Sequence, residues 1–193
     1  MIGKRFLLLG ALTLTTALHA TTISWQDRGT PNDKGCYTLT HKGDNTQRAI
    51  RFNFSLTGSP TSGCLLAYGA DNSNNYGIRL RYDSGKLIAE MKPVSNNTRV
   101  DAYTTVTGVT PALKQGKNEI VIAMERVGQR NTSAIFINGI KCFTLTESNQ
   151  QGFDWNRAKF GAPFSVTEEL TALAGGTLSN FAVAEVYETT IQD

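Results

Sequence analysis

The segment Asp71–Tyr76, with the sequence DNSNNY, gathers a carboxylate, several amides and an aromatic ring in six residues. Carboxylate and amide oxygens accept hydrogen bonds from hydroxyl groups, and a ring offers a flat apolar face on which a sugar can stack. The candidate ligand-binding residues here are Asp71, Asn74, Asn75 and Tyr76. Asp and Asn oxygens also bind calcium, for which Asp71 and Asn72 are the candidates. The alternative is an Asx-rich turn that satisfies its own backbone.

A second candidate is the segment Phe153–Arg157, FDWNR, in the least regular part of the chain. Its polar and aromatic groups are Asp154, Trp155 and Arg157. A carboxylate, an indole and a guanidinium on one loop can hold the hydroxyl groups and the apolar face of a sugar. The alternative is a tryptophan that caps the core. If this segment and Asp71–Tyr76 meet in the fold, they form one groove.

Catalytic constellations are not apparent in the sequence. His41 is the only histidine beyond the first twenty residues, so no Ser-His-Asp set can be assembled. Glu185 and Glu188 are close in sequence, but three residues along a strand place two carboxylates on opposite faces. We interpret them as solvated ends of the last strand. No glycine-rich phosphate loop is present, and the sequence therefore predicts a protein without enzymatic activity.

The first twenty residues have the pattern of a secretory signal peptide. Lys4 and Arg5 precede a short apolar run, Phe6–Leu14, and small residues follow up to Ala20. The run is too short to span about 30 Å of hydrocarbon. We expect a signal peptide over 1–20 and one domain over 21–193, secreted, periplasmic or held at the cell surface.

The net charge limits the classes of partner that we expect for the exported chain. Lys4 and Arg5 leave with the leader, so 17 of the 19 basic residues remain against 16 acidic ones, a formal charge of +1. Nucleic acids and anionic membranes attract basic proteins. This balance predicts neither a nucleic-acid partner nor membrane insertion.

Three cysteines remain after cleavage: Cys36, Cys64 and Cys142. Export makes a disulfide plausible, and an odd number leaves at least one thiol. Three buried thiols that act as small apolar side chains are the alternative. No Cys-x-x-Cys pair indicates a metal.

The region Asn118–Thr146 predicts three strands, Glu119–Val127, Ser133–Ile137 and Ile140–Leu145. Asn138-Gly139 indicates a two-residue hairpin, because a type I′ turn needs positive φ at both central positions. The expected pairs are Ile137 with Ile140, Phe136 with Lys141, Ile135 with Cys142, and Ala134 with Phe143. The expected core face is Ile135, Ile137, Ile140 and Cys142.

Other segments also have strand patterns. Arg48–Leu56 alternates apolar and polar residues, Thr57–Gly63 has loop composition, and Cys64–Tyr68 is apolar. A second hairpin pairs Tyr76–Tyr82 with Lys86–Met91 around Ser84-Gly85. The remaining strands expected are Cys36–His41, Thr98–Val106 and Thr177–Thr190, after a polar edge segment, Thr21–Lys34; Val166–Leu173 could form one short helix. The fold class is all-β, a two-sheet antiparallel β-sandwich of the jelly-roll type.

Two motifs carry a resemblance to a known family. One is the strand, polar turn and Asn-Gly hairpin of Asn118–Thr146; the other is the glycine break followed by Leu178–Val183. Together they resemble the laminin G-like and concanavalin A-like lectin-glucanase jelly-roll superfamily, over about Arg48 to Tyr187. Family hydrolases carry a Glu-x-Asp-x-x-Glu acid set, which this sequence lacks. The usual Trp and His-Val-Ala run of the strand before the hairpin are also missing.

The resemblance and the two loops predict a secreted, non-catalytic module that binds carbohydrate. One alternative is an extracellular adhesion or structural module that contacts protein, with the odd cysteine available for dimerisation. A glycoside hydrolase or lyase with an unfamiliar site is the third. Function is argued from the site, because one sandwich fold hosts many functions.

Overall fold

A computed structural model describes residues 20–31, 35–39, 47–69, 77–92, 94–95, 98–99, 104–106, 108–128, 130–148, 156–164 and 171–192. These residues form strands and connections, and no helix. The strands are β1 (Ala20–Asp27), β2 (Cys36–Thr38), β3 (Gln47–Gly69), β4 (Gly77–Asp83), β5 (Lys86–Lys92), β6 (Val94–Ser95), β7 (Thr98–Arg99), β8 (Thr104–Val106), β9 (Gly116–Val127), β10 (Arg130–Ile137), β11 (Ile140–Ser148), β12 (Arg157–Phe160) and β13 (Ala174–Gln192).

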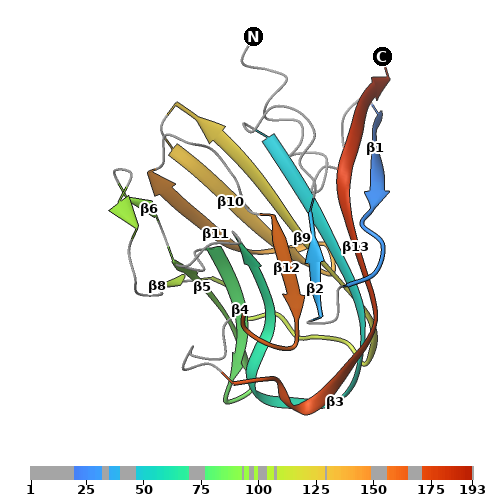
Figure 1. Cartoon of the computed structure of the whole chain (residues 1–193), viewed down its shortest axis with the longest axis vertical. Coiled ribbons are helices and arrows are strands. Elements are labelled where there is room, and N and C mark those ends of the chain that lie inside the picture. The colour runs from blue at the N-terminus through green and yellow to red at the C-terminus, as the bar shows by residue number, and fades with distance from the viewer. Residues whose placement is uncertain are drawn as a thin grey trace.

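The long strand β3 organises the molecule, because each of its halves belongs to a different layer (Figure 1). Its first half pairs with β9 and β13, and its second half pairs with β4 and β12. Sheet A therefore contains β6, β11, β10, β9, the first half of β3, β13 and β1, with β7 on its margin. Sheet B contains β2, β12, the second half of β3, β4, β5 and β8. Nearly all pairings are antiparallel; β6 pairs with β11 in parallel.

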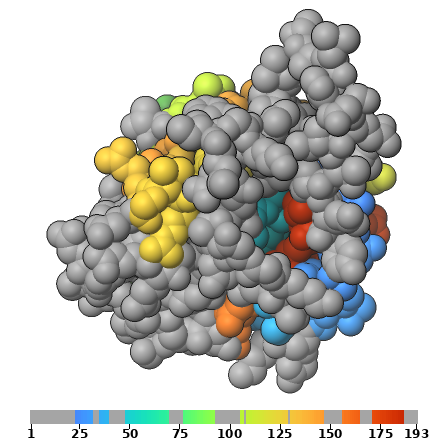
Figure 2. Space-filling view, turned by 90° about the horizontal axis from the view of Figure 1, so that it is seen from above, coloured from blue at the N-terminus to red at the C-terminus, as the bar shows by residue number. Residues whose placement is uncertain are grey.

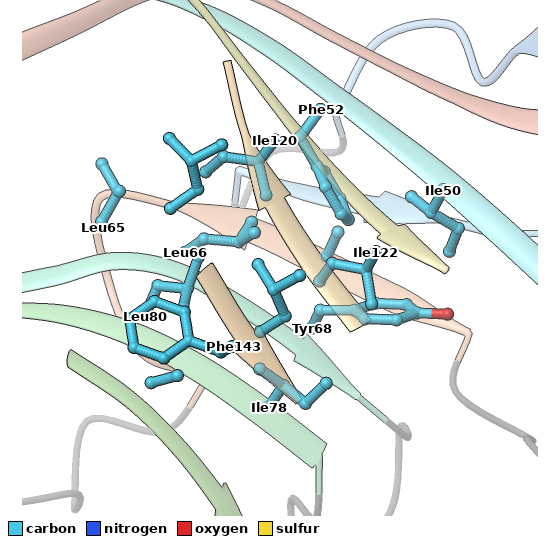
Figure 3. Packing of buried hydrophobic residues seen from close by; sticks show 14 of the residues in the cluster. Ile50, Phe52, Leu65, Leu66, Tyr68, Ile78, Leu80, Ile120, Ile122 and Phe143 are labelled. Carbon is cyan, nitrogen blue, oxygen red and sulfur yellow. The ribbon is translucent and has the colours of Figure 1, made fainter. Parts of the chain in front are cut away.

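The core fills the space between the two sheets (Figure 3). Sheet A contributes Ile50 and Phe52 from β3 and Ile120 and Ile122 from β9, each fully buried. Sheet B contributes alternate residues of its strands, including Tyr68, Ile78, Leu80, Leu87, Ala89, Met91 and Ala158. Alternation sends every second side chain to the core and the others outward. The expected all-β, two-sheet sandwich is confirmed.

The Asn138-Gly139 hairpin is confirmed, with φ of 51° and 81° at the two turn residues. Ile137 pairs with Ile140 and Phe136 with Lys141, as predicted. The next two pairs are wrong, because a bulge shifts the register by one residue. Ile135 faces Phe143, and Ala134 faces Thr144.

The expected core face of this hairpin is also wrong at one position. Ile140 is 61% exposed, although Ile135, Ile137 and Cys142 are buried as predicted. Phe143 joins them in the core. The extra residue at the bulge reverses which side chains face inward beyond it, which explains Phe143 and which the sequence alternation does not reveal. Ile140 lies on the turn side of the bulge, at the first position of β11.

The second hairpin has the predicted register: Tyr82 pairs with Leu87, Leu80 with Ala89, and Asp83 with Lys86. The Thr57–Gly63 segment is not a loop. It belongs to β3, which continues through positive φ at Gly58 and Gly63. Glycine accepts these backbone angles without steric cost, so a segment with loop composition turns the strand from one sheet into the other.

Three further expectations need correction. The polar segment Thr21–Lys34 contains β1, which pairs with β13 along its whole length. The short helix at Val166–Leu173 is wrong where it is described, because Ala172 forms a bridge with Cys64; the rest of that range lies outside the described residues. No disulfide forms: Cys36, Cys64 and Cys142 are all buried without one.

Within the described ranges, the chain forms no helix with the length and apolarity that crossing a membrane would need.

Candidate functional site

Four strand ends meet at one end of sheet B, where the first predicted binding segment is flanked on both sides and the second one ends. β3 ends at Gly69 and β4 starts at Gly77, so these residues flank the segment 70–76. Asn156 follows the segment 151–155, and its backbone N–H donates to the Gly69 carbonyl at 2.9 Å. The Leu39 N–H donates to the Asn156 carbonyl at 2.8 Å, which joins the end of β2 to the same point. The attachment points of the two segments are therefore neighbours.

The strand ends at this site are packed so closely that an added methyl group would not fit. A Cβ on Gly77 would lie 2.3 Å from the Tyr68 carbonyl oxygen and 2.5 Å from the Cα of Gly69. The φ of Gly77 is 151°, in the region that side chains rarely adopt. Gly69 and Gly77 also pair directly across β3 and β4. The two strands can approach this closely only because residue 77 is a glycine.

Of the sequence-predicted ligand residues, Arg157 is the one within the described part of the chain. It begins β12, pairs with Gly69 on one side and Thr38 on the other, and is half-buried. Asp71, Asn72, Asn74, Asn75, Tyr76, Asp154 and Trp155 lie outside the described residues. Their roles, including the calcium prediction, stay predictions.

Next to this end, the outer face of sheet B carries an ion-pair cluster. The Nε of Arg79 donates to one oxygen of Glu90 at 2.5 Å, and the Nε of Arg81 donates to the other at 2.7 Å. The Glu90 side chain is only 8% exposed. One buried carboxylate therefore fixes the directions of two guanidinium groups on β4.

Asp83 extends this cluster to the turn. It accepts hydrogen bonds from Arg81 at 3.1 Å and from Ser84 at 3.0 Å. The hydrogen bond from Arg81, followed by that from Ser84, lowers the pKa of the Asp83 carboxyl. Burial alone would lower the pKa of Arg81, but its bonds to Glu90 and Asp83 outweigh burial and raise that pKa. Both shifts favour the charged forms of Arg81 and Asp83 at neutral pH.

This cluster was not predicted from the sequence. Its signal was present: Arg79 and Arg81 are two residues apart on one strand, and the predicted hairpin register already placed Glu90 opposite Arg79. Side chains that share a face across paired strands interact. The sequence pattern could have identified the face, although not the burial of Glu90.

The acidic pair considered for catalysis is not a pair of solvated residues. Glu185 is 4% exposed and forms an ion pair with Arg28, so the expectation of solvation is wrong there. The contact ties the end of β1 to β13. Among the residues that the structure describes, no three His, Cys, Asp or Glu side chains gather as a metal site.

Comparison with known proteins finds similar structures but no related sequence. No protein-family model matches the sequence. The curated proteins also give no match. Solved structures with a similar arrangement include carbohydrate-binding modules, laminin LG domains and toxin binding domains.

One such structure is the Ruminococcus gnavus IT-sialidase CBM40 bound to alpha2,3 sialyllactose. Its sequence is 15% identical to this chain, the match covers 72% of this chain and 75% of that chain, and the TM-score is 0.42. CBM66 from Bacillus subtilis has 11% identity, coverage of 86% and 95%, and a TM-score of 0.42. The LG1-3 region of the laminin alpha2 chain has 12% identity, coverage of 80% and 30%, and a TM-score of 0.44. Similarity at this level assigns no ligand to the chain.

Proposed function

We propose that this chain is a secreted, non-catalytic module that binds carbohydrate at the end of sheet B, with the leader 1–20 removed and 21–193 forming one domain. The observation that supports it most is the hydrogen bond between Asn156 and Gly69, which places the attachment points of both candidate segments side by side. Residues of both segments then act on one ligand. Asp71, Asn74, Asn75 and Asp154 bond hydroxyl groups, Tyr76 and Trp155 stack on rings, and Arg157 adds a cation.

A rigid base supports this role. The strand ends that carry the segments are joined to each other by backbone hydrogen bonds, and β3 and β4 are in contact at Gly69 and Gly77. Binding loops on a rigid scaffold lose less conformational freedom when a ligand binds. If calcium binds through Asp71 and Asn72, its role is to order the first segment.

Binding to a glycan array and to immobilised polysaccharides tests the proposal. The wild-type chain should bind at least one glycan, and Trp155→Ala, Asp71→Ala and Arg157→Gln should each weaken binding. Lys141→Gln on the outer face of sheet A is the control, because Lys141 is exposed and distant from sheet B along the strand order. No binding to any glycan, or equal binding by all variants, would overturn the proposal.

A protein-binding module is the second candidate, and β1 is the observation that favours it. Among the described strands, β1 pairs with β13 alone, so it is the outermost strand at one edge of sheet A. An outermost strand can add a strand from a partner through backbone hydrogen bonds. The covalent dimer considered from the cysteine count has less support, because all three thiols are buried. A non-reducing gel that shows a disulfide-linked dimer would restore it.

A further inference from the structure

The Asn138-Gly139 turn has a chemical reactivity that its structural role does not use. Elsewhere in the sequence no asparagine is followed by glycine. In a flexible chain, the backbone nitrogen of a glycine reaches the side-chain carbonyl carbon of a preceding asparagine easily, because glycine has no side chain to hinder the approach. The side-chain amide then leaves as ammonia. This dipeptide is therefore the position of the chain most prone to deamidation.

The reaction at this turn needs only the chain itself and water. The Gly139 nitrogen forms a bond to Asn138 Cγ, the Cγ–Nδ2 bond breaks, and the proton of the Gly139 N–H leaves with the ammonia. The product is a five-membered cyclic imide. Water then opens one of its two carbonyl groups, which yields aspartate or isoaspartate at position 138. Either product carries a negative charge that asparagine lacks.

The glycine side of the turn is open to this reaction. Gly139 is exposed, and a Cβ built on it would meet no atom within 4 Å. Water reaches the peptide bond between the two residues, and the imide ring has room there. The folded protein can therefore restrain the reaction only through the position of the Asn138 side chain.

Both ends of the Asn138 carboxamide are bound to β9. Its Oδ1 accepts from the Glu119 N–H at 3.0 Å, and its Nδ2 donates to Asn118 Oδ1 at 3.0 Å. The Asn138 backbone N–H donates to the Glu119 carbonyl at 2.9 Å. The side chain and backbone of Asn138 thus continue the ladder between β9 and β10 by one more pair. Turning the carboxamide toward the Gly139 nitrogen breaks both of its hydrogen bonds.

Asn118, which binds the Asn138 amide, is itself fixed in place. It is 2% exposed, and its Nδ2 donates to the carbonyls of Lys114 and Gly116. Its Oδ1 also accepts from the Lys114 N–H at 2.9 Å. Asn118 cannot follow a moving Asn138 without leaving backbone groups unpaired, which is costly in a buried environment.

We propose that Asn138 is a dormant deamidation site, kept as the amide by Asn118 and Glu119 and modified when the hairpin opens locally. The rate then follows the small population of molecules in which this turn is open. The change is not reversed by closing the turn. An aspartate at 138 has a second acceptor oxygen where the amide donated, and it faces Asn118 Oδ1, which is also an acceptor.

The deamidation site is separate from the candidate ligand site. Glu119, which faces the turn, pairs with Asn53 in the first half of β3, whereas Gly69 ends the second half of that strand. Figure 2 shows β12, in orange, at the molecular surface beside β2 in light blue, and these strands border the candidate ligand site. Deamidation should therefore leave carbohydrate binding unchanged, and the two proposals are tested independently.

Mass spectrometry of the peptide that contains Asn138 measures the reaction in protein aged at mildly alkaline pH, with and without denaturing urea. Deamidation should be at least about tenfold slower in the native protein, because two hydrogen bonds must break first. Asn180 is the internal control: its φ is also positive, at 52°, but the bulky Phe181 follows it. It should deamidate far more slowly than Asn138 in urea. Equal rates at Asn138 in both conditions would overturn the proposal.

Asn118→Ala should raise the native rate at least about fivefold, because the Asn138 amide loses one of its two hydrogen bonds. Gly77→Ala is the matched control, since it destabilises the fold at the contact between β3 and β4 and leaves the bonds of the turn intact. Urea unfolding measures the stability of both variants. Equal acceleration at equal stability would show that global unfolding alone exposes Asn138, which contradicts local protection.

Hydrogen exchange of the Glu119 N–H makes the same test in the wild-type protein. This N–H is bonded to Asn138 Oδ1, so its exchange reports opening of the turn. Exchange and deamidation should rise together as urea is added below the unfolding transition. A rise in exchange without faster deamidation would contradict the proposal.

Discussion

Glu90 determines how the outer face of sheet B is arranged. Its carboxylate is buried, and each of its oxygens accepts from the Nε of a different arginine. A buried charge without a partner is costly, and so are two guanidinium groups brought together without an anion. This carboxylate therefore stabilises the hairpin and also orients the basic groups.

Glu90→Gln should lower the free energy of unfolding by about 2 kcal/mol, because a neutral amide cannot balance Arg79 and Arg81. Urea unfolding followed by circular dichroism measures this. Asp83→Asn is the matched control, since the Asp83 side chain is 55% exposed and should leave the midpoint nearly unchanged. Equal stability of Glu90→Gln and wild type would contradict the role given to Glu90.

Gly77→Ala should destabilise the chain by about 3 kcal/mol, because the added methyl group collides with the backbone of Tyr68 and Gly69 and the backbone angle is unfavourable. Gly85→Ala also has positive φ but meets nothing within 4 Å, so only the backbone cost of about 1 kcal/mol should appear. Denaturant unfolding compares the two. A Gly77→Ala protein as stable as Gly85→Ala would show that the strand ends are not close-packed.

The three thiols should resist an aromatic disulfide reagent in the native protein and react fully in denaturant. Burial raises the pKa of the Cys142 thiol. Its thiolate fraction near pH 8 is therefore below that of an exposed thiol and grows only as pH rises through the raised folded pKa. Neutral Cys142 thus stabilises the fold below its unfolded pKa. Fast native labelling at pH 8 would contradict this burial.

At the scale of elements, an asparagine pair fixes the Asn138-Gly139 hairpin to the segment before β9. The Asn118 Nδ2 donates to the carbonyls of Lys114 and Gly116, and its Oδ1 accepts from the Lys114 N–H and the Asn138 Nδ2. The Asn138 Oδ1 accepts from the Glu119 N–H at 3.0 Å. Asn118 is 2% exposed, so its bonding capacity is used within the protein.

Asn118→Ala should cost about 3 kcal/mol of stability, because several buried backbone groups lose their partner. Asn138→Gly should cost about 1 kcal/mol, because glycine keeps the positive φ and loses only the side-chain bonds. Thermal unfolding of the two variants measures both losses of stability. If Asn138→Gly were the more damaging change, the turn would depend on its own amide rather than on Asn118.

The sequence predicted elements whose information is local. Asn138-Gly139 and Ser84-Gly85 set the turns, and period-two alternation predicted the faces of β4, β5 and β10. Features that depend on distant partners were missed. The bulge near Cys142 lies next to Phe143, which forms a bridge with the distant residue Gly108. The segment β1 has no strand pattern of its own and is extended through its pairing with β13. No local pattern in either segment reports such a partner.

At the scale of the whole molecule, β3 places the candidate site by passing from one sheet to the other. Its composition near Gly58 and Gly63 looks like a loop, so its continuity depends on pairing with β4, β9 and β13. From the sequence, Arg157 and the two segments were identified by chemistry alone. That Arg157 lies beside Gly69, the last described residue before the first segment, needed the pairing of β12 with β3.

Amide chemical shifts during titration with an oligosaccharide that the glycan array identifies as a ligand test the location of the site most directly. The account predicts the largest changes at Gly69, Gly77, Asn156 and Arg157, with Lys159 and Lys92 following and the outer face of sheet A unchanged. Changes centred on sheet A around Val121 and Phe136, with sheet B silent, would contradict it.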